Sequence, residues 1–327
     1  MLRFTSLVLC ALVGCTCQAP KQRVQGTVLW RSYVGDQGVE VCFSALGPNA
    51  HVLQCGPIAG PWRTLYEGSS PRHTQPAFFA SAEHVWIAPI LGAWGGQPHV
   101  LVLDSATSST MRIDLQQPGE VRLSANAVAV ERPLTSNCRY PGRVLASLET
   151  GEQQCIPVAA GHLVPRTASL AAIIDASDGG CVRFLRVGAS IDELGSALVE
   201  GARDGVFLTD DQLLVQGRDA QWWNVHVDGG VTRHALDGVL YSLSFAGEVD
   251  GEPLLVGVLG SRSVSAGHRG AVRLLLDGGV RVWSSSASPQ EEVDAVFFES
   301  ALHFVRTERD DAGLLWRLEA ATTQESF

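Results

Sequence analysis

Two stretches of the sequence decide the fold: WWNVHVDGGVTRHAL at residues 222–236 and AVRLLLDGGVRVWSS at residues 271–285. In each, an Asp-Gly-Gly turn separates two apolar stretches rich in Val, Leu and Trp. Such residues suit half-buried strands. Asp-Gly also suits a two-residue hairpin tip, where both central residues need a positive φ. Each stretch therefore predicts an antiparallel hairpin.

The two turns, near Gly229 and Gly278, belong to a series that repeats along the chain at intervals of 37 to 57 residues. The other members lie near Pro48, Ser105, Gly151, Gly188 and Ala320. A repeat of roughly 45 residues is typical of propeller blades, each a four-stranded antiparallel sheet. The sequence therefore predicts an all-β fold, a β-propeller of about seven four-stranded blades, with six or eight as alternatives. Two packed β-sandwiches are the other architecture that fits.

Helical patterns are nearly absent from the body of the chain, which we place at residues 26–327. The best helix candidate is SIDELGSALVE at residues 190–200, and Gly195 divides it. Glycine in a helix interior is unfavourable, so we expect this segment also to belong to the β fold.

The stretch VSAGHRGAVRLLLDGGVRVW at residues 264–283 resembles the propeller repeat of the regulator of chromosome condensation family. VAAGH at residues 158–162 is similar to the opening of that repeat, and SDGGCVRF at residues 177–184 is similar to its close. The resemblance implies propeller geometry for these units. We carry over no partner and no activity from the family, and the acidic charge of this chain argues against a chromatin role.

The composition indicates a globular protein with a sizeable core and an acidic surface. Apolar residues make up 46% of the chain, and 34 Asp and Glu outnumber 24 Lys and Arg, giving a formal charge of −10. An acidic surface repels phosphate backbones. We therefore expect no nucleic-acid partner.

The amino terminus reads as a secretory signal. Arg3 supplies a positive charge, and residues 4–13 form an apolar run too short to span a bilayer. The run ends in Leu12-Val13-Gly14-Cys15, which resembles the bacterial lipobox. The resemblance implies that residues 1–14 are removed, that Cys15 carries acyl chains, and that residues 15–25 form a lipidated tether. A plain signal cleaved elsewhere, for instance after Ala19, is the alternative.

The acyl chains make the membrane itself the first predicted partner, since two or three chains together give stable anchoring. Thr16 follows the modified cysteine, whereas an Asp there would favour the inner membrane of enterobacteria. We therefore expect the protein in the bacterial cell envelope, at the outer membrane.

Export to an oxidising compartment permits disulfides. Cys42 and Cys55 flank a strand-turn-strand segment, and Cys138 and Cys155 flank another. We predict these two disulfides, while the state of Cys17 and Cys181 is left open. The spacing of the cysteines does not fit zinc, so we expect no metal and no cofactor.

Few motifs indicate chemistry. The sequence contains no GxSxG, HExxH, P-loop or GxGxxG motif. Trp94, among glycines, is a candidate for stacking on a ligand. His162 and His268, in the two AGH segments, are the most interesting histidines, although a packing histidine bonded to the backbone explains either one.

These observations lead to two functional hypotheses. The first is a membrane-anchored lipoprotein whose propeller is a non-catalytic binding or scaffold platform for an envelope protein or a glycan. The alternative is a polysaccharide- or ester-cleaving enzyme acting in the central funnel. The enzyme hypothesis predicts His or carboxylate side chains that converge at one mouth of the propeller axis.

Overall fold

The structure is a computed structural model. It describes residues 23–24, 27–46, 51–68, 77–80, 85–91, 97–104, 110–133, 138, 142–158, 161–177, 179–218, 221–234, 239–249, 252–260, 268–274, 280–284, 293–299, 301–311 and 313–320. The elements it describes are all β-strands, which confirms the all-β prediction.

These strands form seven antiparallel sheets, numbered here in chain order. The first sheet contains β1 (Thr27–Gly35), β2 (Gly38–Leu46), β3 (His51–Pro57) and β4 (Arg63–Gly68). The second contains β5 (Ala77–Ala80), β6 (Val85–Ala88), β7 (Ile90–Leu91), β8 (His99–Asp104) and β9 (Thr110–Asp114). The third contains β10 (Val121–Leu123), β11 (Ala127–Glu131), β12 (Arg143–Ser147) and β13 (Gln153–Ile156).

The remaining sheets follow the same plan. The fourth contains β14 (His162–Thr167), β15 (Leu170–Asp175), β16 (Cys181–Val187) and β17 (Ile191–Leu198). The fifth contains β18 (Asp204–Phe207), β19 (Gln212–Gln216), β20 (Trp222–His226) and β21 (Val231–Arg233). The sixth contains β22 (Val239–Val249), β23 (Glu252–Gly260), β24 (His268–Leu274) and β25 (Val280–Ser284). The seventh contains β26 (Val293–Phe298), β27 (Ala301–Asp310) and β28 (Gly313–Ala320).

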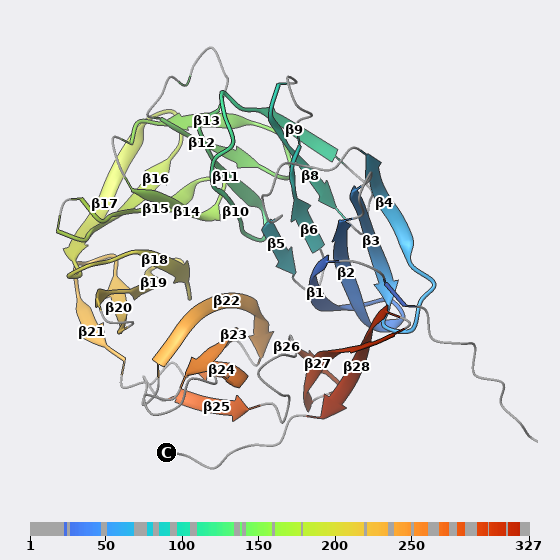
Figure 1. Ribbon diagram of the computed structural model, residues 1–327. Helices are drawn as coiled ribbons and strands as arrows, with labels where there is room; N and C mark the ends of the chain where they lie inside the picture. Colours follow the sequence, from blue (N-terminus) through green and yellow to red (C-terminus); the bar gives the residue numbers. More distant parts are fainter. Residues whose placement is uncertain are drawn as a thin grey trace, which may run out of the picture.

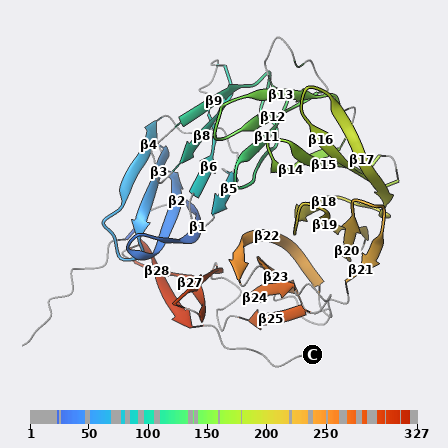
Figure 2. The ribbon, with the colours of Figure 1, turned by 180° about the vertical axis from the view of Figure 1, so that it is seen from behind.

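The sheets follow one another around a ring, with the first strand of each sheet nearest the centre (Figure 1). The view from behind shows the same order (Figure 2). This arrangement is a β-propeller, so the alternative of two packed β-sandwiches is wrong. The described residues contain seven sheets, the number that the turn spacing predicts. That the complete chain has seven blades stays a prediction.

The predicted turns fall mostly between the third and fourth strands of a sheet. The turns at Gly151, Gly188 and Gly229 lie at this position. In the sequence, Ser105 falls between β8 and β9, and Gly278 falls between β24 and β25. Residue 48 falls between β2 and β3, which pair as an antiparallel hairpin, while Gly60 lies in the turn between the third and fourth strands of this sheet. The assignment near Ala320 is wrong, because Ala320 is the last residue of β28.

The hairpin at Gly229 differs from the predicted two-residue tip. Gly229 has a φ of 90°, but Asp228 is not among the non-glycine residues with positive φ. The amide of Gly229 donates to the His226 carbonyl at 2.9 Å, and the amide of His226 donates to the Gly230 carbonyl at 2.8 Å. The turn is therefore a longer one, in which only the glycine needs the left-handed region.

The second sheet shows how one proline divides a strand. β6 and β7 both pair with β8, and Pro89 lies between them. Proline has no amide hydrogen and cannot donate to the ladder. Its carbonyl still accepts a hydrogen bond from the amide of Leu101 at 3.1 Å, so the two pieces act as one strand position.

Apolar side chains fill the spaces between neighbouring sheets. Phe184 of the fourth sheet meets Phe207 of the fifth edge to face, with ring centroids 6.0 Å apart.

The best helix candidate in the sequence, residues 190–200, contains strand β17 of the fourth sheet. A Cβ on its Gly195 would lie 1.7 Å from the carbonyl oxygen of Val227, in the turn between β20 and β21 of the fifth sheet. Glycine is therefore needed there for the close approach of two backbones.

The first and last sheets close the ring. Val24 pairs with Leu314 at the outer edge of β28, through two hydrogen bonds of 2.9 Å. Trp316 of β28 is 1% exposed and packs against Trp30 and Phe43 of the first sheet and against Trp62, which directly precedes β4. The first segment that the structure describes thus extends the last sheet, and an aromatic cluster fills the junction between the two sheets.

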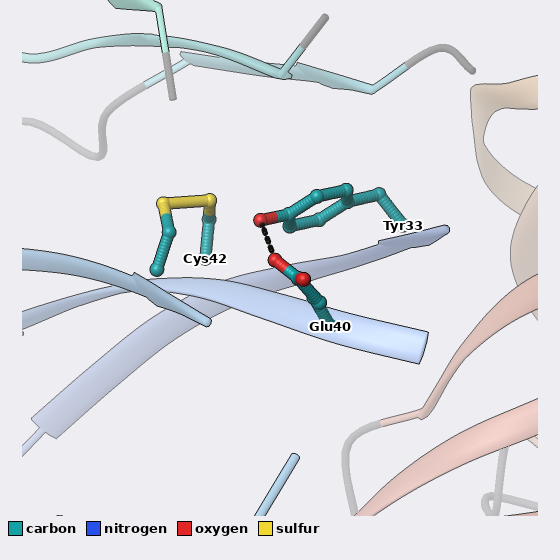
Figure 3. The surroundings of a disulfide bond; sticks show 4 residues. Tyr33, Glu40 and Cys42 are labelled. Carbon is teal, nitrogen blue, oxygen red and sulfur yellow. Dashed lines mark hydrogen bonds between the residues drawn. A yellow bond between two sulfur atoms is a disulfide. The ribbon is translucent and has the colours of Figure 1, made fainter. Parts of the chain in front are cut away.

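Both predicted disulfides are present. Cys42 lies directly opposite Cys55 on β2 and β3, and Cys138 bonds to Cys155 of β13. Beside the first of these, the hydroxyl of Tyr33 donates to Glu40 at 2.6 Å across β1 and β2 (Figure 3). Cys181 is half-buried and takes part in neither of these two disulfides.

Candidate functional site

Three innermost strands begin at the same end of the ring. Within a four-stranded antiparallel sheet the chain returns to the end at which the sheet began. The connections from β13 to β14 and from β17 to β18 are short, so β10, β14 and β18 all start at this end. We call this end the mouth.

Charged side chains gather at the mouth. We define the mouth cluster as Glu120, Arg122, Glu131, Arg143, His162 and Asp204. Glu120 and Arg122 belong to the start of β10, His162 begins β14, and Asp204 begins β18. The cluster thus joins residues from three consecutive sheets.

Direct contacts link these three sheets. Nδ1 of His162 lies 2.5 Å from Oε2 of Glu120. Arg122 donates to Oε1 of Glu120 at 2.6 Å and to Oδ1 of Asp204 at 2.5 Å. The guanidinium group is therefore shared between two carboxylates, and Glu120 is held by a partner on each oxygen.

The third sheet contributes a second ion pair to the mouth cluster. Glu131 ends β11 and Arg143 begins β12, and their side chains meet at 3.0 Å. Arg143 also donates to the Gly161 carbonyl at 2.7 Å, next to His162. The amide of Glu131 donates to the Glu120 carbonyl at 3.0 Å. This ion pair supports the β10 side of the cluster and ties it to the fourth sheet.

The disulfide Cys138–Cys155 braces this second ion pair. Cys138 belongs to the connection from Glu131 to Arg143, and its sulfur lies 3.3 Å from the Arg143 carbonyl oxygen. Because the covalent bond ties this connection to β13, it restricts the movement of both members of the pair.

The contacts shift the pKa values of the Glu120–His162 pair in opposite directions. Burial raises the pKa of Glu120, but the hydrogen bond to His162 and the charge of Arg122 outweigh it and lower the pKa to about 2. The hydrogen bond to Glu120 raises the pKa of His162, against the opposing effect of burial. The pair therefore favours a carboxylate beside a protonated imidazole.

The arrangement supports two kinds of chemistry. A histidine oriented by a carboxylate can accept or donate a proton, or can bind a metal ion. Charged groups at a rigid opening can also bind polar groups of a partner.

The sequence singles out only one member of the mouth cluster. His162 is interpreted there as a packing histidine bonded to the backbone, but its Nδ1 contacts a carboxylate. His268 begins β24, and its side chain lies outside the described residues. Cys15 and Trp94 also lie outside them. No sequence pattern indicates the other members of the cluster, which are Glu120, Arg122, Glu131, Arg143 and Asp204. Aligning the starts of consecutive blades could have found those on the innermost strands.

No family model matches the sequence, and no curated protein matches it. Solved structures do match. The fold is similar to acylaminoacyl peptidase from Pyrococcus horikoshii, with a TM-score of 0.51 and 10% identity over 90% of this chain and 52% of the peptidase. This chain therefore spans about half the length of that peptidase.

Two further structures are similar at lower scores. TolB from Acinetobacter baumannii has a TM-score of 0.44, with 12% identity over 80% of each chain. The dihydro-heme d1 dehydrogenase NirN has a TM-score of 0.48, with 13% identity over 94% of this chain and 77% of NirN. At these identities the likeness concerns the fold alone.

Proposed function

We propose that the protein is an exported β-propeller, anchored to the outer membrane through acyl chains on Cys15, that acts as a non-catalytic binding platform. The observation that carries the proposal is the mouth cluster, in which charged side chains of three consecutive sheets hold one another at one opening of the ring. Groups that are already positioned bind a partner at a lower entropic cost. The proposed partner is an envelope protein or a glycan, whose charged, amide or hydroxyl groups these side chains can recognise.

Two observations support the proposed location. The disulfides Cys42–Cys55 and Cys138–Cys155 indicate an oxidising compartment, and so an exported protein. The lipobox-like stretch at residues 12–15 supplies the attachment point. Within the part of the chain that the structure describes, no helical segment has the length and hydropathy of a membrane span.

Fractionation of cells tests the anchor. Cys15→Ser should move the protein from the membrane fraction to the soluble fraction. Cys17→Ser is the matched control, because the residues before Cys17 do not form a lipobox, and it should leave the protein on the membrane. Equal membrane association of wild type and Cys15→Ser would count against the anchor.

Capture from envelope extracts tests the binding face. Arg122→Gln and Asp204→Asn should each lose the captured partner. The matched controls are Arg112→Gln and Asp114→Asn, because Arg112 and Asp114 form an exposed ion pair of 2.9 Å on the outer strand β9. If the mouth variants retain the same partner as the controls, the binding face lies elsewhere.

A second candidate function is a polysaccharide- or ester-cleaving enzyme acting in the funnel. The contact between His162 and Glu120 at the mouth favours it, because that hypothesis predicts a histidine and carboxylates converging there. Turnover of envelope polysaccharides and of a chromogenic ester, present in wild type and lost in His162→Gln, would support this function. Equal turnover by both proteins would contradict it.

A further inference from the structure

Three side chains of the mouth cluster bring metal-ligand atoms close together. Glu120, Glu131 and His162 each offer one ligand atom, and these atoms all lie within 4.8 Å of one another. They come from two neighbouring sheets and from three separate positions: the residue before β10, the end of β11 and the start of β14. The site is half-buried, so it is held by the fold and remains open to solvent ions.

An arginine holds the carboxylate of Glu120, and another holds the carboxylate of Glu131. Arg122 holds Oε1 of Glu120, which leaves Oε2 beside Nδ1 of His162. Arg143 holds Oε1 of Glu131, and Oε2 of Glu131 lies 3.5 Å from the amide nitrogen of Glu120. Hydrogen bonds of this kind, from outer groups to ligand carboxylates, are typical of metal sites.

The net charge of the mouth cluster also favours the binding of a cation. Three carboxylates face two guanidinium groups, so one net negative charge remains when His162 is neutral. A structural network of ion pairs accounts for Arg122 and Asp204. Among the residues that the structure describes, the second oxygen of Glu131 has only a long contact, of 3.5 Å, to the backbone amide of Glu120.

We propose that Glu120, Glu131 and His162 form a binding site for a divalent transition-metal ion, with zinc as the best match. An imidazole with two carboxylates suits zinc, and three protein ligands leave a coordination position for water or for a ligand. The ion enters between Nδ1 of His162 and Oε2 of Glu120. It displaces the proton that these atoms share, and this proton is released to solvent. The site uses three residues of the mouth cluster, and it does not depend on the lipid anchor or on the capture of a partner.

Calorimetric titration of the full-length protein with zinc chloride, in detergent and after treatment with a chelator, tests the site. Wild type should bind one zinc ion. Glu131→Gln and His162→Ala should each weaken binding by about tenfold or more, since the loss of a first ligand costs at least as much as the loss of an outer partner. Glu131→Gln keeps an oxygen for Arg143, so the fold is preserved, and thermal unfolding verifies this.

Two control variants remove the same groups elsewhere. Glu200→Gln changes an exposed glutamate that is bonded to Arg218 at 2.8 Å, and His99→Gln changes a half-buried histidine of β8, outside the mouth cluster. Both should bind zinc as wild type does. The proposal is overturned if wild type binds no zinc, or if either Glu131→Gln or His162→Ala binds it with wild-type affinity, because other histidines or Cys181 would then be the ligands.

Discussion

Nδ1 of His162 lies 2.5 Å from Oε2 of Glu120, although 42 residues separate them in the sequence. The contact joins β14 of the fourth sheet to the start of β10 in the third. Against the opposing effect of burial, this contact and the charge of Arg122 together lower the pKa of Glu120 to about 2, and the contact raises the pKa of His162. The mouth of the propeller is therefore held by a pair whose charges depend on pH.

This pair should make the stability of the protein depend on pH. The lowered pKa of Glu120 contributes stability above pH 4.5, which is lost as the pH falls toward 2. The raised pKa of His162 contributes stability below pH 6.5, which is lost as the pH rises through its folded value. The difference in Tm between wild type and His162→Gln should therefore be largest between pH 4.5 and 6.5. His99→Gln is the control, and a difference for His162→Gln that does not vary with pH would contradict the prediction.

The two disulfides should contribute similar stability but differ in their effect on the mouth. They join residues separated by 13 and 17 positions, and each should contribute about 3 kcal/mol to the free energy of unfolding. Urea denaturation of Cys42→Ala/Cys55→Ala and of Cys138→Ala/Cys155→Ala measures these losses. Only the second pair braces Glu131 and Arg143, so only its removal should weaken the pH dependence of Tm. The same weakening in both variants would refute the bracing role.

Ring closure should depend on Trp316. It is 1% exposed and contacts Trp30 and Phe43 of the first sheet and Trp62 directly before β4. Trp316→Ala should lower the free energy of unfolding by about 3–5 kcal/mol, as large core truncations do. Leu318 lies on the same strand but is 42% exposed, and Leu318→Ala should change stability by about 0.5 kcal/mol or less. Equal losses in the two variants would show that the junction is not a core.

Gly195 should tolerate no side chain. A Cβ there would lie 1.7 Å from the Val227 carbonyl oxygen, whereas a Cβ on Gly188 would meet nothing closer than 3.9 Å. Neither position has a positive φ, so the comparison isolates the steric effect. Gly195→Ala should cost about 1–3 kcal/mol, as overpacking does, and Gly188→Ala should be nearly neutral. Thermal unfolding measures both, and a neutral Gly195→Ala would contradict the close approach of the two sheets.

The fold could be predicted from the sequence because hairpin turns are local features. Glycines such as Gly151 and Gly229 mark a turn wherever it occurs, and their spacing reports the length of one blade. The misplaced turn at Ala320 is the last of the series, so no later turn corrects its register. The disulfides could be predicted for the same reason, since each closes a short segment.

The mouth cluster could not be predicted in this way. Arg122 and Asp204 are 82 positions apart and meet only because the third, fourth and fifth sheets begin at one end of the ring. Such contacts depend on the direction of each strand and on the angle between sheets. Neither can be inferred from the residues around a single charged side chain. Of the mouth cluster, the sequence therefore indicates only His162, because it lies in a repeated AGH segment.

The amino terminus of the native protein, purified from membranes, provides the most direct test of the proposed function. Mass spectrometry should find that the first residue is Cys15 and that it carries the added mass of a diacylglyceryl group. An unmodified terminus that begins at another residue, such as Pro20 after cleavage at Ala19, would contradict the anchor and, with it, the proposed place of the propeller at the membrane.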